Sequence, residues 1–189
     1  TTVNTIAPPL GTDTTIWLGG NFTTMTTSIS RPYLAKVNST NGDLVNGGLS
    51  ADYIVNKIIS RGDSVFVAGD FSRLGLKTDY LGSITEGSSN ADQTMPNANG
   101  LIRCVIPDGS GGWYVGGAFT VIGGVSKNYI AHILSNKTVD ASFTASCNSW
   151  VFSIVKDGGR LYLGGYFTTV NSTPRNYVAA VNANTGAII

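Results

Sequence analysis

The sequence Leu161-Tyr162-Leu163-Gly164-Gly165-Tyr166-Phe167 is one of four copies of a single pattern, in which apolar residues precede two small residues and a closing Phe. The other copies are Ile16-Trp17-Leu18-Gly19-Gly20-Asn21-Phe22, Val65-Phe66-Val67-Ala68-Gly69-Asp70-Phe71 and Trp113-Tyr114-Val115-Gly116-Gly117-Ala118-Phe119. The closing Phe recurs at intervals of 49, 48 and 48 residues. A fixed period of this length indicates a repeat architecture.

Two further series keep the same order in every repeat. An apolar pair precedes the glycine pattern, at Val3 and Ile6, Val55 and Ile58, Ile102 and Val105, and Val151 and Ile154. A tyrosine series follows it, at Tyr33-Leu34-Ala35, Tyr80-Leu81-Gly82, Tyr129-Ile130-Ala131 and Tyr177-Val178-Ala179. A weaker fourth segment closes the unit, at Gly42-Asp43-Leu44, Val139-Asp140 and Gly186-Ala187-Ile188. In the second repeat we expect the polar, Asn-rich residues 85–100 to replace this segment.

The three series and the weak fourth segment predict four short antiparallel strands per repeat. Turn residues such as Asp108-Gly109 and Asp157-Gly158 join the first two strands, as a tight hairpin requires. The glycine-pattern strand is apolar on both faces, which is typical of a strand buried between stacked sheets. Four strands in about 48 residues are the unit of a β-propeller blade. A parallel β-helix is the competing fold, but its coils are shorter and lack hairpin turns.

We therefore predict an all-β chain, a single β-propeller domain over residues 1–189 with four four-stranded blades. The repeats span approximately 1–51, 52–99, 100–148 and 149–189. The four blades either close into a ring or form part of a larger propeller. We also expect the chain to be a piece of a larger protein, since it opens on Thr1.

Composition narrows the functions that the chain can have. Charged residues make up 12% of the sequence, about half of the usual ~25%, and the net charge is +1. Without a basic run to follow a phosphate backbone, we expect no nucleic-acid partner. No apolar run approaches the ~20 residues of a membrane helix, so we expect no membrane insertion.

The third and fourth repeats resemble the delta-60-type propeller repeat. The resemblance rests first on residues 157–170, which read Asp-Gly-Gly-Arg-Leu-Tyr-Leu-Gly-Gly-Tyr-Phe-Thr-Thr-Val, and on Pro174-Arg175-Asn176-Tyr177. It rests also on Val139-Asp140-Ala141-Ser142-Phe143, which is similar to the segment that links one blade to the next in that family. The resemblance covers essentially the whole chain, and the second repeat departs from it most. It implies a propeller in a secreted or surface protein of bacteria, and it supplies no catalytic residues.

Few residues suit catalysis or metal binding. His132 is the only histidine, and it occupies the variable slot of Lys36, Ser83 and Ala180, so we expect it at the surface or half-buried. A catalytic triad, a zinc site or another cofactor is therefore not expected, and the chain is predicted not to be an enzyme. A two-carboxylate glycosidase site remains the catalytic alternative. Cys104 and Cys147 are an even pair, and the sequence leaves open whether they form a disulfide.

Three basic residues are candidate binding residues. Arg31, Lys127 and Arg175 each stand two positions before the repeated Tyr, so a propeller would arrange them as a ring on one face. Such a ring would receive an anionic glycan or carboxylates of a partner. The alternative is that each cation bonds carbonyl groups of its blade or a neighbouring carboxylate.

Candidate glycosylation sites form a second group. Asn21, Asn38, Asn136 and Asn171 each open an Asn-x-Ser/Thr sequon. Thr26 and Thr27 lie in a hydroxyl-rich loop after the first closing Phe, where glycans could attach. The alternative is that these residues are ordinary polar loop formers.

Taken with the composition, these patterns predict a non-enzymatic structural or interaction module outside the cell or on its surface. An adhesin segment or the subunit of a bacterial surface fibre fits best, with other copies of itself, other surface proteins or glycans as partners. Apolar strands at both ends of the chain leave unpaired edges, which we expect to pair with neighbouring copies or with further parts of the same polypeptide. The alternative is a carbohydrate-binding propeller module of a secreted enzyme, with loop aromatics as sugar platforms.

Overall fold

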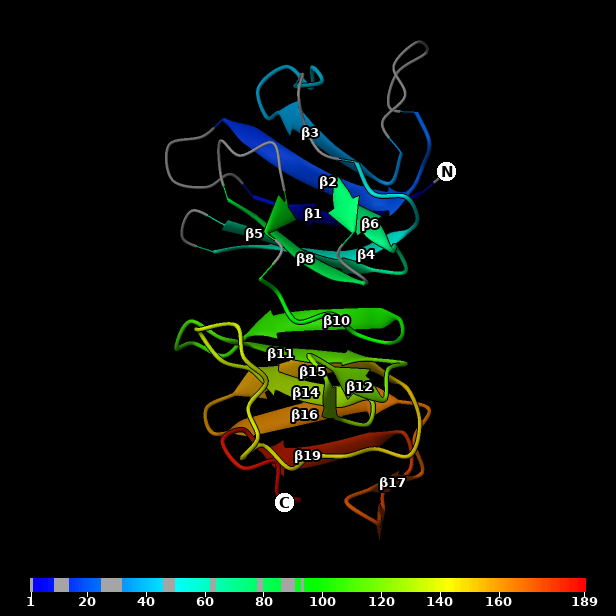
Figure 1. The fold of residues 1–189 in the computed structure, drawn as a ribbon, viewed down its shortest axis with the longest axis vertical. Coiled ribbons are helices and arrows are strands. Elements are labelled where there is room, and N and C mark those ends of the chain that lie inside the picture. The colour runs from blue at the N-terminus through cyan, green and yellow to red at the C-terminus, as the bar shows by residue number, and fades with distance from the viewer. Residues whose placement is uncertain are drawn as a thin grey trace. The chain divides into compact units, whose positions relative to one another are not determined.

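The computed structural model describes residues 2–8, 14–24, 32–45, 50–61, 64–77, 80–85, 91–92 and 94–189. Within these ranges all of the regular secondary structure is β-strand, so the fold is all-β as predicted (Figure 1). The chain forms two compact units, Thr1–Met95 and Pro96–Ile189, and the division falls four residues before the predicted end of the second repeat at residue 99. The prediction of a single domain stays a prediction, and the two units are described separately.

The first unit contains two antiparallel sheets. One has the order β1-β2-β3, and the other has the order β4-β5-β8-β9. A two-stranded ribbon, β6-β7, accompanies the second sheet. The strands are β1 (Thr2–Ala7), β2 (Thr15–Asn21), β3 (Leu34–Asn38), β4 (Val55–Arg61), β5 (Ser64–Gly69), β6 (Arg73–Leu74), β7 (Leu76–Lys77), β8 (Leu81–Thr85) and β9 (Ala91–Asp92).

The second unit repeats the same plan. Its sheets have the orders β10-β11-β14 and β15-β16-β19, with the ribbons β12-β13 and β17-β18. The strands are β10 (Ile102–Pro107), β11 (Trp113–Gly117), β12 (Val121–Ile122), β13 (Val125–Ser126), β14 (Ile130–Ile133), β15 (Val151–Asp157), β16 (Arg160–Gly165), β17 (Thr169–Val170), β18 (Thr173–Pro174) and β19 (Val178–Asn182). The strand of each glycine pattern lies in the middle of its sheet, between the two strands that the flanking series predicted.

The weak fourth segments form the outer edges of the sheets. Single antiparallel bridges join Val37 to Leu44, Ile133 to Val139 and Val181 to Ile188. In the second repeat, Ile84 pairs with Ala91 of β9. The expectation that residues 85–100 replace this strand was therefore wrong: the polar segment still supplies a short edge strand, because backbone pairing needs no apolar side chain.

The second glycine of each pair is required by a β-bulge in the hairpin. The register shifts after Val3, Val55, Ile102 and Val151. A Cβ atom on Gly20, Gly69, Gly117 or Gly165 would overlap the carbonyl oxygen of the residue that precedes the bulge, which is Thr2, Ile54, Leu101 or Trp150. Only glycine tolerates that approach, so the pattern reflects backbone packing.

The closing Phe and the repeated Tyr are joined in every repeat. Phe22, Phe71, Phe119 and Phe167 are all buried. The amide of each Tyr donates to the carbonyl of the Phe in its own repeat, over 2.7–2.9 Å, and its carbonyl accepts from the second glycine. Each Tyr adopts a left-handed backbone, with φ between 63° and 70°. Bulky residues rarely adopt this conformation, so the paired backbone bonds hold a locally strained turn.

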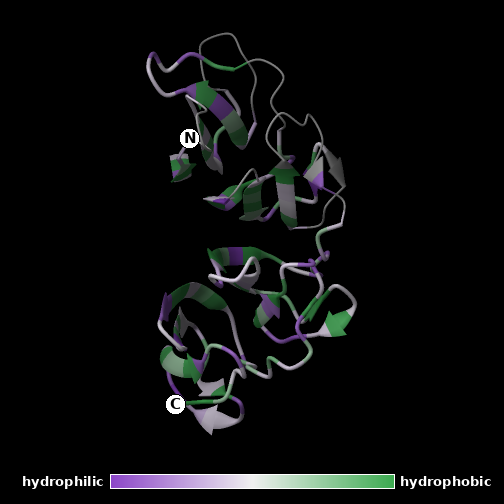
Figure 2. Ribbon diagram, turned by 90° about the vertical axis from the view of Figure 1, so that its left-hand side faces the viewer, coloured by the Kyte–Doolittle hydropathy of each residue, from purple (hydrophilic) through white to green (hydrophobic). Residues whose placement is uncertain are grey.

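Within each unit the two sheets stack through opposite faces. We call the face that carries the first small residue of the pair the glycine face, and the face that carries the apolar pair of the first strand the leading face. A Cβ on Gly19 would overlap Val55 and approach Ile58 of the next sheet, and one on Gly116 would lie 2.8 Å from Val151. Each unit has an apolar core cluster of its own among the described residues. Figure 2 shows hydrophobic residues interrupted by hydrophilic ones along single strands.

Candidate functional site

The most polar buried cluster of the described residues surrounds His132. Its Nδ1 lies 2.8 Å from Asp140 Oδ2, and its Nε2 lies 3.2 Å from Asp108 Oδ2. The imidazole stacks on Tyr114 at 4.4 Å between ring centroids, and Phe143 packs edge-on against it. His132 is therefore buried, and the expectation that it lies at the surface or half-buried was wrong, because two aspartates compensate for the burial of a polar ring.

Different elements of the third repeat bring these residues together. Asp108 follows β10 in the hairpin turn, His132 lies on β14, and Asp140 follows the bridge at Val139. The Asp108 carboxylate also accepts from the amides of Ser110 and Gly112, and the Asp140 carboxylate accepts from the amide and hydroxyl of Ser142. Each aspartate thus shapes its own turn and holds one imidazole nitrogen.

The electrostatics of the cluster favour ionised aspartates. Burial alone would raise the pKa values of Asp108 and Asp140, but their hydrogen bonds, including those from His132, outweigh burial and lower both values. Burial, together with the two carboxylates, raises the pKa of Tyr114 to about 12, and its hydroxyl donates to the carbonyl of Ala183 over 2.8 Å.

This arrangement suits structural cross-linking better than proton transfer. A ring with both nitrogens engaged by carboxylates has no free atom with which to accept a proton from a substrate. Among the described residues, no group of three or more His, Cys, Asp or Glu side chains is arranged to hold a metal ion. The cluster ties the hairpin turn of the third sheet to its outer edge.

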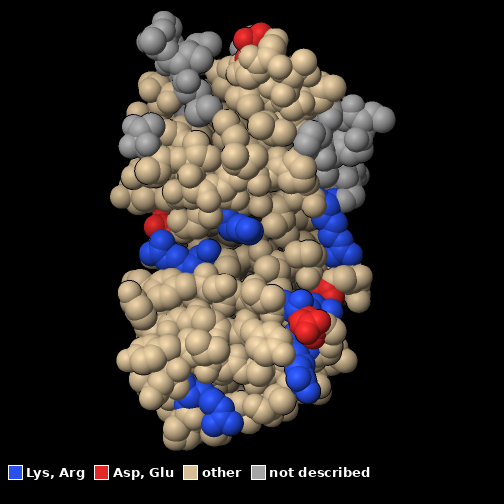
Figure 3. Space-filling model, turned by 180° about the vertical axis from the view of Figure 1, so that it is seen from behind, with Lys and Arg blue, Asp and Glu red and all other residues tan. Residues whose placement is uncertain are grey.

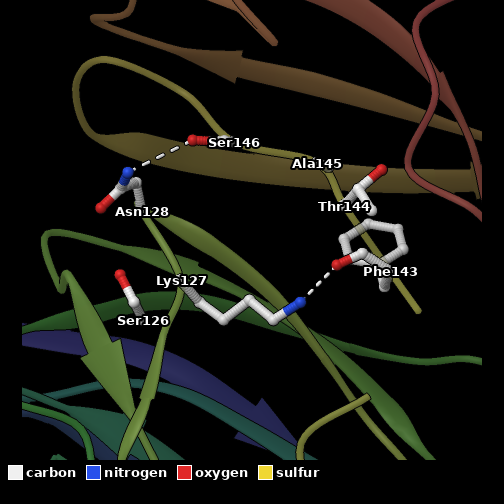
Figure 4. A pocket seen from close by; sticks show the side chains of 7 residues that line it. All are labelled: Ser126, Lys127, Asn128, Phe143, Thr144, Ala145 and Ser146. Atoms are coloured by element: carbon white, nitrogen blue, oxygen red, sulfur yellow. Dashed lines mark hydrogen bonds between the residues drawn. The ribbon is translucent and has the colours of Figure 1, made fainter. Parts of the chain in front are cut away.

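A small pocket lies beside this cluster. It has a volume of about 180 Å³ and is lined by residues 126–128 and 143–146. Lys127 is buried in its wall, and its Nζ donates to the carbonyl oxygen of Phe143 (Figure 4). Burial lowers the pKa of Lys127, while the Asp140 carboxylate opposes that shift. The lysine therefore joins β13 to the segment that leads into the fourth repeat.

The described members of the predicted cation ring bond backbone carbonyls. Lys127 bonds Phe143, and Arg175 donates to the carbonyl of Pro174 over 2.9 Å. Arg31 lies outside the described residues. Both described contacts correspond to the alternative given for this ring. Figure 3 shows basic and acidic side chains in small separate groups on one face, with most of that face uncharged.

The candidate glycosylation sites differ in exposure and in the hydrogen bonds that their side-chain amides make. Asn21 and Asn136 are exposed, while Asn38 is half-buried. Asn38 and Asn136 accept amide hydrogen bonds of the following turn through Oδ1. Asn171 also donates from Nδ2 to the carbonyl of Gly186, so a glycan on that nitrogen would compete with an internal bond. Thr26 and Thr27 lie outside the described residues.

The two cysteines do not form a disulfide. Cys104 and Cys147 are both buried without a disulfide, which settles the question that the sequence left open. Burial raises the pKa of Cys147 to about 12, so its thiol is a poor nucleophile.

Aromatic side chains gather at one edge of the fourth sheet, and the sequence reasoning did not single them out. Phe152 packs edge-on against Tyr166 at 4.6 Å and against Trp150 at 6.0 Å between ring centroids. Trp150 and Tyr166 are exposed, and the Arg103 guanidinium lies 5.8 Å from the Trp150 ring centroid. The signal was present in the sequence, since the Tyr166 slot holds Asn21, Asp70 and Ala118 in the other repeats.

Comparison with known proteins identifies the type of repeat. Residues 107–143 and 159–184 match a family described as a β-propeller domain of unknown function, DUF5122. The chain therefore contains repeats of the β-propeller type. The match falls on the third and fourth repeats, where the resemblance to a propeller repeat is strongest.

Solved structures agree with this assignment at the level of the fold. A computationally designed protein, Ika4, is similar with a TM-score of 0.60 and 10% sequence identity, over 90% of this chain and 89% of that one. The WD40 β-propeller domain of Doa1 is similar with a TM-score of 0.60 and 12% identity, over 99% of this chain and 53% of that one. No curated protein matches the sequence. In the described residues, no helix is long and apolar enough to cross a membrane.

Proposed function

We propose that this protein is a non-enzymatic structural and interaction module outside the cell or on a bacterial surface, where it builds a fibre or an adhesin. One observation carries the proposal: the glycine face of the fourth sheet exposes large apolar side chains, Val155, Tyr162 and Val178. A contiguous apolar surface on a folded repeat is typical of a protein interaction site.

The polar clusters of the second unit support this reading. Asp108, His132 and Asp140 bond one another and their own turns, and Lys127 bonds a backbone carbonyl. Chemistry on a substrate needs polar groups that the fold leaves available. Here these polar groups are occupied by hydrogen bonds within the fold, whereas the apolar glycine face of the fourth sheet is exposed.

The finer architecture belongs to the same proposal. Each of the four sheets has the strand order of a propeller blade, with a short outer strand or bridge. We propose four blades of about 48 residues, of the delta-60 type, that form a closed ring or part of a larger one. Low overall charge supports close packing between copies, because like-charge repulsion is weak at a net charge of +1.

Electron microscopy of cells that make the chain tests this function. Antibody labelling is expected to mark filaments or an ordered layer outside the cell. A panel of glycan and peptide substrates, incubated with the purified chain, is the companion measurement. Label confined to the cell interior, or turnover of any substrate, would overturn the proposal.

A second candidate function is carbohydrate binding, and the aromatic edge of Trp150, Phe152 and Tyr166 favours it. Exposed aromatic faces bind the apolar faces of sugar rings. Binding to a glycan array, lost in Trp150→Ala and kept in Tyr162→Ala, would support this candidate. The second variant is a matched control because Tyr162 is exposed on the same sheet but lies outside this cluster. No binding by the unaltered chain would exclude it.

A further inference from the structure

One interface occurs twice in the chain, and both copies have the same design. In each unit, the apolar pair on the leading face of one sheet fills the space above a glycine of the preceding sheet. Val55 and Ile58 lie against Gly19, and Val151 and Ile154 lie against Gly116. These four apolar side chains are at most 4% exposed. In the first unit, the amide of Ile58 also donates to the Thr5 hydroxyl over 3.1 Å.

The fourth sheet carries the glycine half of this interface without its apolar half. A Cβ built on Gly164 would have one neighbour within 4 Å, Ser153 of the same sheet, at 3.8 Å. Cross-strand pairing places Val155, Tyr162 and Val178 on that glycine face. They are 58%, 38% and 66% exposed, whereas Tyr114 and Ile130, in the slots of Tyr162 and Val178, are 2% and 0% exposed.

The first sheet carries the opposite half. Val3 and Ile6 occupy the slots of Val55 and Ile58 on a leading face, and they are 49% and 62% exposed. Among the described residues of the first unit, no sheet packs on this pair as the preceding sheet packs on Val55 and Ile58. The first unit therefore carries one half of the interface that each unit forms internally, and the second unit carries the other half.

We propose that the glycine face of the fourth sheet binds the leading face of the first sheet of a second copy of this chain. Val3 and Ile6 of that copy fill the space above Gly164, as Val55 and Ile58 do above Gly19. The partner is a second copy because its leading face has the residue types that this interface uses inside the chain. The contact is continuous with the stacking already present in each unit.

The polar atoms fit the same arrangement. Ser153 occupies the slot of Thr5, and both pair with the first glycine of their sheet. Its hydroxyl is exposed, so it can accept from the amide of Ile6 in the second copy, as Thr5 accepts from Ile58. This contact joins different faces of the two copies, so it is heterologous and leads to a chain of subunits or a ring. The inference rests on the proposed interaction function and names its partner and surface.

Two variants that each remove one half of the interface test the proposal. Gly164→Leu fills the open space on the fourth sheet, and Ile6→Glu places a charge on the first. By sedimentation, the unaltered chain is expected to form species that grow with concentration, and each variant alone is expected to stay monomeric. An equimolar mixture keeps one intact pair of faces, so it is expected to form a dimer of twice the monomer mass and nothing larger.

The control is Gly159→Leu, because Gly159 also has open space around it but lies in the hairpin turn. This variant is expected to assemble as the unaltered chain does, and circular dichroism checks that all three variants fold. A monomeric unaltered chain at every concentration would overturn the inference, as would a mixture that stays monomeric. Labelled extracellular filaments with a monomeric purified chain would leave the proposed function standing while this interface failed.

Discussion

The third and fourth sheets have the same strands and the same sequence pattern, yet one is buried where the other is open. Tyr114 and Tyr162 hold the same slot on the glycine face, but the second is far more exposed than the first. The third sheet is followed by another sheet of its own unit, whereas no described sheet of that unit covers the glycine face of the fourth. The repeat pattern therefore specifies a surface that fits a neighbour, and position along the chain decides whether the neighbour is present.

The two repeats also differ in polarity at their outer edges. In the third repeat the amide of Asp140 donates to the carbonyl of His132, and in the fourth the amide of Ile189 donates to the carbonyl of Ala180. Ala180 therefore holds the slot of His132, and Ile189 holds the slot of Asp140. The third sheet thus gains a hydrogen-bonded cross-link through His132 that the fourth lacks. This contrast separates what all repeats share, the glycine and Phe framework, from what one repeat has added.

The largest expected effect concerns the framework that the two sheets share. Phe119→Ala and Phe167→Ala are each expected to lower the free energy of unfolding by about 3–5 kcal/mol, because both rings are fully buried. Urea unfolding at low protein concentration measures this cost. A loss below about 1 kcal/mol for Phe167→Ala alone would show that the fourth repeat lacks the core of the third.

A smaller effect separates the two glycine faces directly. Gly116→Ala is expected to cost about 1–3 kcal/mol, since the added methyl group meets Cys104 and Val151. Gly164→Ala is expected to be neutral or to stabilise by about 0.5–1 kcal/mol, since the space is open and Ala is favoured over Gly in a strand. Thermal unfolding of the two variants compares them. Equal costs would contradict the difference between the two faces.

The tyrosines provide a comparison at about 1 kcal/mol. Tyr114→Phe removes the hydroxyl that bonds Ala183, so it is expected to cost about 1–2 kcal/mol. Tyr162→Phe changes an exposed side chain and is expected to stay within about 0.5 kcal/mol of the unaltered chain. Urea unfolding midpoints of the two variants compare these two losses of stability. A larger loss for Tyr162→Phe would reverse the assignment of buried and open faces.

The smallest effect is expected from pH, because burial opposes the hydrogen bonds that lower the pKa values of Asp108 and Asp140. A carboxylate whose pKa is lower in the folded state stabilises the fold above its unfolded pKa of 3.8, and this stability is lost as pH falls through the folded value. Unfolding measured from pH 6 to pH 2 is expected to show this loss. It should shrink in Asp140→Asn, while Asp157→Asn, in the slot of Asp108 on the fourth sheet, serves as the control. An unchanged pH profile in Asp140→Asn would contradict the role of the cluster.

Local sequence patterns predicted the strands of each repeat, the hairpin turns and the burial of the glycine-pattern strand. These features follow from alternation and turn chemistry, which act within a few residues and occur four times. The His132 cluster was missed because its members are distant in sequence and come together through the pairing of β10, β11 and β14. One signal was available: Ser83 and Asp92 occupy the corresponding slots of the second repeat, and they too are hydrogen bonded.

The exposed face of the fourth sheet could not be read from the sequence for a different reason. Val178 belongs to a series in which Leu34, Leu81 and Ile130 are all buried, so its residue type predicts a core position. Exposure depends on which sheet lies above it, and the local sequence carries no record of that neighbour. Burial of a residue type is a property of the stack as well as of the strand.

The left-handed Tyr that closes each repeat has a consequence for how such chains diversify. The Tyr amide bonds the carbonyl of the closing Phe in all four repeats, although the loop between them differs in length, as Phe22 and Tyr33 compared with Phe71 and Tyr80 show. Because this backbone hydrogen bond fixes the two ends of the loop, a change of residues within the loop does not alter the pairing of the sheet. Closing a loop that is a few residues longer costs little additional entropy. Insertions there can accumulate across generations without disturbing the scaffold. New recognition loops can therefore evolve, or be grafted by design, between a fixed Phe and a fixed Tyr.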